Sequence, residues 1–381
     1  MIERLIASHI IKNCFKGKAI IIIGPRQSGK TTLLNILKER LAGSYIFLNC
    51  DEPDIREMLT DATSTQLKNL IGKASIVYID EAQRVKNIGI TLKLIIDQIP
   101  QTQLIVTGSS ALELSNTINE PLTGRKFEYI LLPFSEEELI HHYSLLEEKR
   151  MLEQRILFGF YPDIVTTTND KKELLRSLAG SYLYKDIFAF QELRRSEVIE
   201  KLLEALALQI GSEVSYGELS NLLGIDFSTV TRYIDLLEKA FVIFRLRSFS
   251  RNLRTELKKS RKIYFYDTGI RNAILNNFQS LKLRADKGAL WENFLVVERL
   301  KYYKFNNLDA KMYFWRTRSK AEIDLIEEKD GALSAYEFKW SPRRKVRIPL
   351  AFEKAYPHCK MHIINQENYL DFVQKHDNIR L

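Results

Sequence analysis

Short runs of consecutive apolar residues mark the first third of the chain, and longer amphipathic stretches separate them. The clearest runs are Ala19–Ile23, Ser75–Ile79 and Leu104–Thr107, and weaker ones cover Tyr45–Leu48 and Phe127–Leu132. A β-branched run without polar alternation is typical of a strand in a parallel sheet, because helices bury both faces of such a sheet. The pattern therefore predicts an α/β domain built on a parallel sheet with helices between its strands.

The middle of the chain shows two stretches of helical periodicity with a turn between them. Apolar residues recur at helical spacing over Ser215–Leu223 and over Ser228–Leu237, and Gly224-Ile225-Asp226 lies between the two stretches. This order predicts a helix-turn-helix, and Ser228 is a candidate N-cap of the second helix.

Two apolar runs after the helix-turn-helix, Phe241–Leu246 and Lys262–Tyr266, predict a pair of strands, and this order of elements is that of a winged helix. Basic residues crowd these strands and the segment between them, where Glu256 is the only acid. They are Arg245, Arg247, Arg251, Arg254, Lys258, Lys259, Arg261 and Lys262.

The C-terminal part combines a long amphipathic helix, Gly288–Leu300, with several strands. The strands predicted after the helix are Met312–Arg316, Glu322–Ile326 and Ser334–Trp340. Alternate residues of a strand share one face, so Glu337 and Lys339 are expected to project together.

The chain has 381 residues, whereas a single hydrophobic core stops growing at roughly 250–300 residues. We therefore expect roughly two to four domains. The early apolar run Ala19–Ile23 is far shorter than the roughly 20 residues of a membrane-spanning helix. The N-terminus also lacks the charge-then-apolar order of a secretory signal. These features predict a cytoplasmic protein without a membrane span.

A glycine-rich turn joins the first predicted strand to a predicted helix that begins at Lys30. Gly24 and Gly29 permit backbone angles and close approach that a β-carbon forbids, so that N–H groups can surround phosphate oxygens at the helix N-terminus. In this pattern Lys30 neutralises the β- and γ-phosphates, and the Thr31 hydroxyl binds Mg²⁺. The motif predicts binding of ATP and Mg²⁺ through Gly24, Pro25, Arg26, Gln27, Ser28, Gly29, Lys30, Thr31 and Thr32.

Polar residues follow two of the other predicted strands. Asp80 and Glu81 end the strand Ser75–Ile79, at the position where α/β sheets place functional side chains. Asp80 is the candidate partner of Mg²⁺, and Glu81 is the candidate base that activates a water molecule. Ser109, in Gly108-Ser109-Ser110, is a candidate contact of the γ-phosphate or of that water.

Arg125 precedes the predicted strand Phe127–Leu132. We interpret it either as an arginine finger, acting in its own subunit or in a neighbouring one, or as an ordinary surface arginine.

The segments GPRQSGKT, IVYIDEAQR, LIVTGSS and LTGRKFEYILLPFSEEEL resemble the core of prokaryotic AAA-type ATPases. The resemblance implies hydrolysis of ATP and a helical lid after the core, from about Ser135 to Asp186. It also implies assembly of a homo-oligomer, for example a ring.

Net charge and its distribution point to a nucleic-acid partner. A net charge of +9 and a pI of about 9.2 favour an anionic partner, because Lys and Arg release counterions when they meet phosphates. The basic hairpin lies beside a predicted recognition helix whose Thr229, Thr231 and Arg232 are candidate groove contacts, so we predict DNA binding. Winged helices also serve as protein-contact modules, and this alternative stays open.

Acidic residues and a lysine recur across the predicted C-terminal elements. Glu292 lies on the helix, Asp324 on a strand, and Glu337 and Lys339 on the next strand. Carboxylates that hold Mg²⁺ and a lysine that orients water are the minimum for phosphodiester cleavage. The pattern resembles the restriction-endonuclease-like domain, which has a helix Glu, a strand Asp and a strand Glu-x-Lys. Alternating charges on an exposed strand are the plainer alternative.

Together these resemblances cover nearly the whole chain. They predict a P-loop AAA-type parallel-sheet core at 1–134, a helical lid at 135–200, a winged helix at 201–272 and an α/β restriction-endonuclease-like domain at 273–381. The predicted function is Mg²⁺-dependent ATP hydrolysis coupled to rearrangement of DNA-facing domains. Two alternatives remain, an ATP-gated Mg²⁺-dependent endonuclease and a nucleotide switch that binds a protein partner.

Overall fold

The computed structural model describes residues 1–109, 121–168, 170–183, 196–250, 261–317, 319–344 and 347–374. They form two compact units. The first unit is Met1–Phe134 with the short segments Lys239–Phe241 and Lys304–Asn307, and the second is the rest of the chain from Ser135. Within the described ranges, every helix is too short or too polar to cross a membrane.

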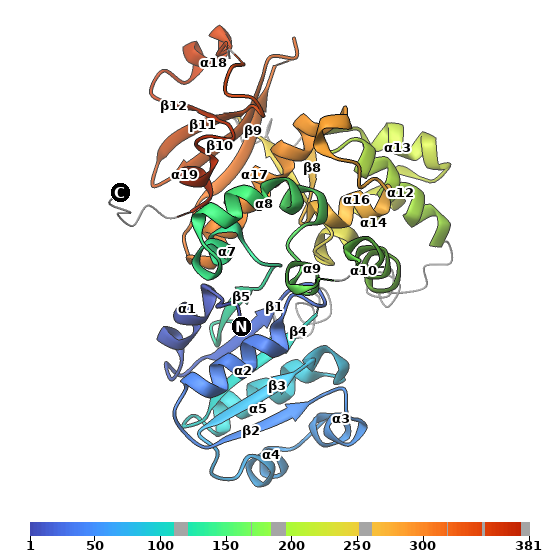
Figure 1. Ribbon diagram of the computed structural model, residues 1–381. Helices are drawn as coiled ribbons and strands as arrows, with labels where there is room; N and C mark the ends of the chain where they lie inside the picture. The colour runs from blue at the N-terminus through green and yellow to red at the C-terminus, as the bar shows by residue number, and fades with distance from the viewer. Residues whose placement is uncertain are drawn as a thin grey trace. The chain divides into compact units, whose positions relative to one another are not determined.

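The first unit is built on a five-stranded sheet in the order β2-β3-β4-β1-β5, and all of its neighbouring strands are parallel (Figure 1). The strands are β1 Ala19–Ile23, β2 Tyr45–Asn49, β3 Ile76–Asp80, β4 Gln103–Gly108 and β5 Lys126–Ile130. The helices are α1 Ile6–Asn13, α2 Lys30–Arg40, α3 Pro53–Leu59, α4 Ser64–Ile71, η1 Ala82–Arg84 and α5 Ile88–Gln98. The predicted α/β fold with a parallel sheet is confirmed.

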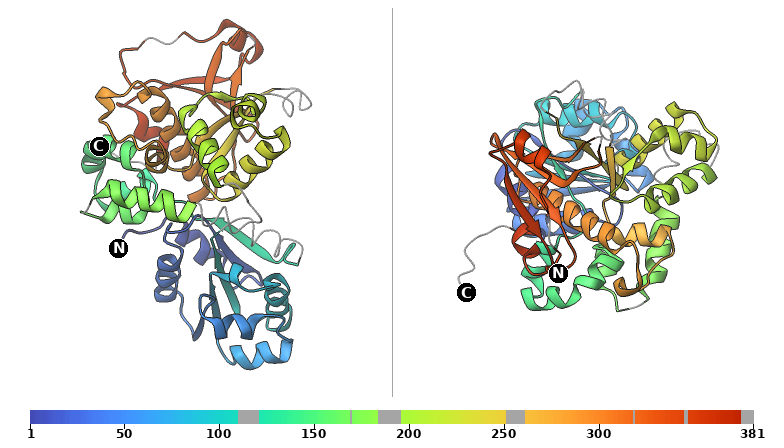
Figure 2. Two further views of the ribbon diagram at one scale, coloured as in Figure 1. Left: turned by 90° about the vertical axis from the view of Figure 1, so that its right-hand side faces the viewer. Right: turned by 90° about the horizontal axis from the view of Figure 1, so that it is seen from above.

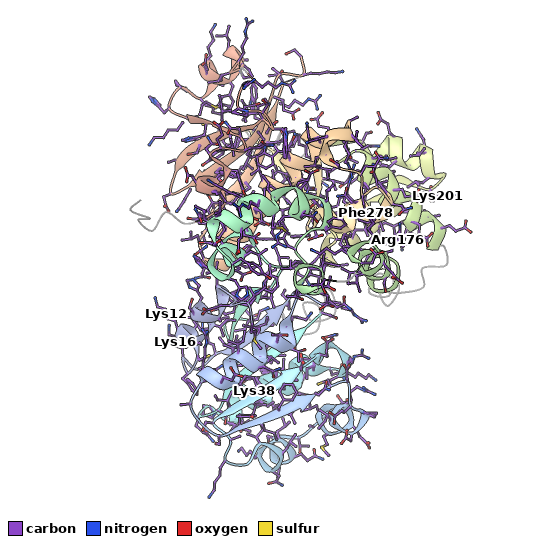
Figure 3. The ribbon with its side chains drawn as sticks, viewed as in Figure 1. Lys12, Lys16, Lys38, Arg176, Lys201 and Phe278 are labelled. Atoms are coloured by element: carbon purple, nitrogen blue, oxygen red, sulfur yellow. The ribbon has the colours of Figure 1, made fainter. Side chains whose placement is uncertain are left out.

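Burial explains which strands had the clearest apolar pattern. Every residue of β1, β3 and β4 is buried, because these strands occupy the middle of the sheet. Strand β2 forms an edge, where Tyr45 is 54% exposed. The ammonium of Lys38, labelled in Figure 3, lies 4.2 Å from the centroid of the Phe47 ring on this strand. The lysine thus stabilises an aromatic ring at the sheet edge by a cation–π contact.

The second unit contains a seven-stranded mixed sheet in the order β12-β11-β10-β9-β7-β8-β6. The strands are β6 Glu213–Val214, β7 Ile243–Ser248, β8 Arg261–Phe265, β9 Lys311–Arg316, β10 Glu322–Lys329, β11 Ala332–Phe338 and β12 Lys360–Ile364. The helices before β7 are α7 Glu136–His142, α8 Leu145–Phe158, α9 Pro162–Thr166, α10 Lys171–Ser177, η2 Leu178–Leu183, α12 Ser196–Leu208, α13 Tyr216–Leu223 and α14 Phe227–Lys239. Those after β8 are α16 Thr268–Ile274, η3 Leu281–Leu283, α17 Lys287–Phe305, α18 Leu350–Ala355 and α19 Tyr369–Val373.

Helices α13 and α14, drawn yellow-green in Figures 1 and 2, occupy the two stretches of helical periodicity, and Gly224 at the end of α13 has φ 62°. Helix α14 begins at Phe227, and the backbone N–H of Thr229 and that of Val230 both donate to the carbonyl of Asp226. Ser228 therefore lies inside the first turn, and its predicted role as the N-cap is wrong.

Strand pairing runs across the predicted boundary at residue 272. Strand β7 pairs antiparallel with β8 on one side and parallel with β9 on the other, where Arg247 is opposite Tyr313. Strands β6 to β8, from the predicted winged helix, therefore share one sheet with strands β9 to β12, from the predicted C-terminal domain. Helices α7 to α10 fall within the predicted lid at 135–200. Asp186, where the family resemblance ends the lid, lies outside the described residues. The domain boundaries stay predictions.

A buried polar junction holds α16 against the end of α8. Asp267 caps α16 by accepting from the backbone N–H of Ile270 at 3.0 Å, and its other oxygen accepts from the N–H of Phe160 at 2.7 Å. At the same junction the Phe158 ring stacks on Phe278, which also receives the guanidinium of Arg176 (Figure 3). Burial raises the pKa of Asp267, and the backbone donors oppose that shift.

Gly269 at this junction provides a test of how tightly α16 is packed. A β-carbon on Gly269 would lie 2.1 Å from the carbonyl oxygen of Phe158, which is backbone and cannot swing away. We expect Gly269→Ala to destabilise the second unit by about 2 kcal/mol or more, because overpacking forces backbone shifts. Gly288→Ala is the matched control, since a β-carbon there meets nothing within 4 Å.

The three tryptophans of the chain, Trp291, Trp315 and Trp340, all belong to the second unit, so urea unfolding followed by their fluorescence reports that unit alone. Equal midpoints for Gly269→Ala and Gly288→Ala would contradict the expectation.

Candidate functional site

The glycine-rich turn lies between β1 and α2, where the chain has little space. A β-carbon on Gly24 would lie 2.1 Å from the carbonyl oxygen of Leu131, whose N–H bonds to the carbonyl of Ile23 at 2.8 Å. Gln27 and Gly29 have φ of 57° and 92°, a conformation that favours glycine at the second position. Helix α2 begins directly afterwards, so the N–H groups of its first turn point toward the glycine-rich turn.

Arg4, which sequence reasoning missed, holds the glycine-rich turn through backbone carbonyls. This side chain is buried, and its guanidinium donates to the carbonyl of Ser28 at 2.9 Å and to that of Leu132 at 2.6 Å. A guanidinium fixed at both ends holds the turn against the segment that follows β5. No local pattern reveals this role, because Arg4 is far from both partners in sequence.

Lys30 is buried at the first position of α2 and points into the turn. Its ammonium donates to the carbonyls of Gly24 at 3.1 Å and Pro25 at 2.9 Å. The positive charge of Lys30 therefore lies inside the turn, where it adds to the positive end of the α2 dipole. An anion at this position would meet both.

Asp80 connects the helix after the turn to two strands. One carboxylate oxygen accepts from the Thr31 hydroxyl at 2.8 Å, and the other accepts from the Thr107 hydroxyl and from the N–H of Glu81. Asp80 is 4% exposed, so these donors offset its loss of hydration. Thr107 was missed in the sequence, although its polar side chain inside the apolar run of β4 was a usable signal.

Glu81, Gln83 and Ser109 form a second set of contacts at the same sheet edge. The Gln83 amide N–H₂ donates to the Glu81 carboxylate at 2.5 Å and to the Ser109 hydroxyl at 2.8 Å, while its carbonyl oxygen accepts from the Ser109 N–H at 3.3 Å. Since a backbone N–H can only donate, the amide orientation is fixed, and its N–H₂ group faces Glu81. Glu81 itself has φ 53°, a left-handed conformation.

Ser109 lies at the same sheet edge as Gly24, because it follows β4, in which Gly108 is opposite Ile23. Ser110 lies outside the described residues. Arg125 precedes β5, and its carbonyl accepts from Ala19 at the start of β1. The length of a five-residue strand, about 16 Å, therefore separates Arg125 from the turn in the same chain. The Arg125 guanidinium bonds to Asp97 at 2.8 Å. Two interpretations are therefore left, an ordinary surface arginine and an arginine finger that acts on a neighbouring subunit.

A second polar cluster lies in the second unit and contains the predicted C-terminal acids. Glu292 on α17 meets Glu322 and Asp324 on β10, and one oxygen from each lies within 4.8 Å of the others. Strand β10 has an irregular register between Ile323 and Ile326, and Asp324 lies within this irregular stretch. Glu322 was missed, although it is two residues from Asp324 on the same strand.

Glu337 and Lys339 contact each other, as their spacing predicted, with the ammonium of Lys339 2.7 Å from the carboxylate. The same ammonium lies 3.7 Å from Asp324, which also accepts from the N–H of Phe338 at 2.8 Å. Burial and the charge of Asp324 raise the pKa of Glu337 to about 6.

Lys262 is also part of this cluster and not of an exposed basic face, so its predicted place among the DNA contacts is wrong. Its side chain is 1% exposed, and its ammonium pairs with Glu292 at 2.7 Å and with Glu322. The Tyr264 hydroxyl donates to the same oxygen of Glu292 at 2.6 Å. Burial lowers the pKa of Lys262, but the carboxylates of Glu292 and Glu322 outweigh it and hold the pKa above its ordinary value.

The rest of the predicted DNA-contact set is only partly exposed. Arg245 is half-buried and pairs with Asp235 and Glu238, whereas Arg232 and Arg247 are exposed. Thr229 and Thr231 are half-buried, and the Thr231 hydroxyl donates to the carbonyl of Phe227 at 3.0 Å. The segment from Arg251 to Lys259, with Arg254, Glu256 and Lys258, lies outside the described residues.

Three family models match successive parts of the chain. Residues 16–140 match an AAA domain, and residues 149–281 and 287–380 match two domains of unknown function, DUF8612 and DUF4143. An uncharacterized protein of Mycobacterium tuberculosis is 26% identical over 89% of this chain and 74% of its own length. An uncharacterized protein of Haemophilus influenzae is 24% identical over 81% of each chain.

Among solved structures, the Walker-type ATPase of Pyrococcus abyssi aligns with a TM-score of 0.51 and 17% identity, and the alignment covers 72% of this chain and 96% of that one. This likeness shows the fold. Together with the AAA match to residues 16–140, it supports a P-loop AAA-type ATPase fold and the binding and hydrolysis of ATP.

The ionisation of Glu292 leads to a prediction for pH dependence. Burial raises the pKa of Glu292 to about 7 although Lys262 opposes that shift, whereas the pKa of a glutamate in the unfolded chain is about 4.3. Between these values the folded state binds the proton and the unfolded state has released it. Stability is therefore lost as pH rises through the folded pKa.

We expect the free energy of unfolding of the second unit to decrease by about 2 kcal/mol between about pH 5 and pH 8, measured in the presence of a chelator. Glu292→Gln should reduce this slope, because glutamine does not titrate, and the raised pKa of Glu337 accounts for part of what is left. Urea titrations followed by tryptophan fluorescence give the slope, and an unchanged slope in the variant would assign it to other groups.

Proposed function

We propose that the chain binds ATP with Mg²⁺ in its first unit and hydrolyses the bond to the γ-phosphate. The observation that carries the proposal is the contact of Asp80 with Thr31 at 2.8 Å, which joins the end of β3 to the first turn of α2. A hydroxyl and a carboxylate oxygen held this close suit Mg²⁺, which prefers oxygen ligands and retains several waters. Thr31 and Asp80 would hold the ion directly or through water.

The other residues of the site bind and orient. The N–H groups of the turn from Gly24 to Thr32 surround the phosphates, and Lys30 turns its ammonium from its carbonyl partners to the β- and γ-phosphate oxygens. Mg²⁺ held by Thr31 and Asp80 would supply positive charge that offsets the charge of the phosphates. Glu81 accepts a proton from the attacking water, and the products are ADP and phosphate. Gln83 holds the Glu81 carboxylate and Ser109 at a fixed separation.

Two substitutions separate binding from turnover. Lys30→Ala should abolish tight binding of ATP, because it removes the buried positive charge of the turn. Glu81→Gln should retain ATP and lose turnover by about 100-fold or more, because the amide cannot accept the proton. Binding is measured with a fluorescent ATP analogue, and turnover by release of phosphate. Normal hydrolysis by Glu81→Gln would remove Glu81 as the base.

We further propose that hydrolysis drives an action on DNA. A net charge of +9 and the exposed Arg232 and Arg247 in the predicted winged helix support contact with phosphates. Assembly of a homo-oligomer, in which Arg125 contacts the nucleotide of a neighbouring subunit, is part of the same proposal. Light scattering that gives a monomer with and without ATP would contradict the assembly.

Two other candidates each rest on a specific observation. The oxygens of Glu292, Glu322 and Asp324 lie close enough together to hold a cation, and Lys339 is adjacent, which favours an ATP-gated endonuclease. Leu222 and Phe227, at the turn between α13 and α14, are 68% and 58% exposed, which favours a nucleotide switch that binds a protein partner.

One assay distinguishes the three candidates. The ATPase rate is measured with Mg²⁺ alone and with single-stranded, duplex and branched DNA, and each DNA is examined for cleavage. We expect DNA to stimulate the ATPase rate without being cleaved. The double variant Arg232→Ala, Arg247→Ala should need about 10-fold or more DNA for the same stimulation at moderate salt. Cleavage that is lost in Asp324→Asn would favour the endonuclease, and no response to any DNA would favour the switch.

A further inference from the structure

The carboxylate cluster of the second unit already contains a positive charge of its own. Lys262 reaches it from β8, and its ammonium lies 2.7 Å from Glu292 and in direct contact with Glu322. These are two of the three residues whose oxygens lie close enough together to ligate one cation. The lysine is not on the surface, since 1% of its side chain is exposed.

Each of the three acids is bonded to groups of the chain itself. Glu292 accepts from Lys262 and from the Tyr264 hydroxyl at the same oxygen, Oε1. Glu322 pairs through one oxygen with Lys262 and through the other with Arg316 at 3.4 Å. Asp324 accepts from the N–H of Phe338 and lies 3.7 Å from the ammonium of Lys339.

Sheet pairing fixes the backbone from which the Lys262 side chain extends. Lys262 is opposite Leu246 on β7 and opposite Glu213 on β6, so its backbone is paired on both sides. Lys262 and Tyr264 share one face of β8, and both donate to Glu292. The strand therefore delivers two donors to one carboxylate, and its backbone cannot shift without breaking ladder hydrogen bonds.

A divalent ion bound by the same oxygens would need the same space. Mg²⁺ and Mn²⁺ bind carboxylate oxygens at about 2.0–2.2 Å, closer than the hydrogen bonds of an ammonium. An ion that contacts both Glu292 and Glu322 would therefore lie against the ammonium of Lys262, with strong repulsion between the two cations.

We propose that Lys262 is the resident cation of this cluster: its ammonium takes the place of a divalent metal ion between Glu292 and Glu322, so the cluster binds no Mg²⁺ and cleaves no DNA. Its role is to join β8 to α17 and β10. This inference is independent of the proposed ATPase function, because it concerns only the second unit. It opposes the endonuclease candidate, which needs a metal ion at the same carboxylates.

The first test measures binding of Mn²⁺ to the full chain without nucleotide. Isothermal titration calorimetry is the first readout, and electron paramagnetic resonance of Mn²⁺ is the second. Up to about 1 mM free Mn²⁺, well above the needs of a functional site, wild type should bind no more Mn²⁺ than Asp324→Asn. A wild-type site that is lost in Asp324→Asn would overturn the inference. This comparison leaves Lys262 unchanged, so it is valid whether or not variants at Lys262 fold.

The second test creates the metal site. Lys262→Met should gain one Mn²⁺ site that the double variant Lys262→Met, Asp324→Asn lacks. Its Tm should fall in a chelator and rise by about 5 °C with Mn²⁺, because the ion neutralises the uncompensated acids. Lys282→Met, at an exposed lysine, is the matched control and should show no such rise. A folded Lys262→Met that gains no Mn²⁺ site would contradict the assignment.

Discussion

Both polar centres of this protein follow from one constraint, which is that a carboxylate removed from water must be met by donors or by positive charge. At the edge of the first sheet, Asp80 meets it with two threonine hydroxyls and a backbone N–H. In the second unit, Asp267 meets it with backbone N–H groups, and Glu292 meets it with a lysine and a tyrosine. In each case at least one donor comes from an element other than the one that carries the acid, so satisfying the acid also joins elements of the fold.

The two centres differ in what they leave available for a ligand. Neutral hydroxyls satisfy Asp80 in the first unit, and hydroxyl and carboxylate oxygens are ligands of Mg²⁺. The acids of the second unit are bonded to Lys262, Lys339 and Arg316, whose charge opposes that of a metal. Buried carboxylates thus favour a bound cation in the first unit, whereas in the second unit the side chains of lysine and arginine already neutralise them.

The sequence predicted what depends on neighbouring residues. The strand before Gly24, the helix after Gly29 and the acids at the end of β3 are local features, and an apolar run or a glycine reveals them. Long-range contacts were beyond it. Arg4 supports the turn through carbonyls that are distant in sequence. Lys262 belongs to a basic stretch in the sequence, and only the position of β8 beside α17 shows that it pairs with Glu292. Net charge cannot distinguish an exposed lysine from a buried one.

The parallel pairing of β7 with β9 also determines how the chain can be divided for experiments. A fragment that began after residue 272 would retain β9 without its neighbour, and the backbone groups beside Tyr313 and Phe314 would form an open sheet edge. Such edges recruit other strands and promote aggregation. Insolubility of that fragment would therefore reflect a severed sheet and not an unstable domain, and work on the C-terminal half should retain everything from Ser135 onward.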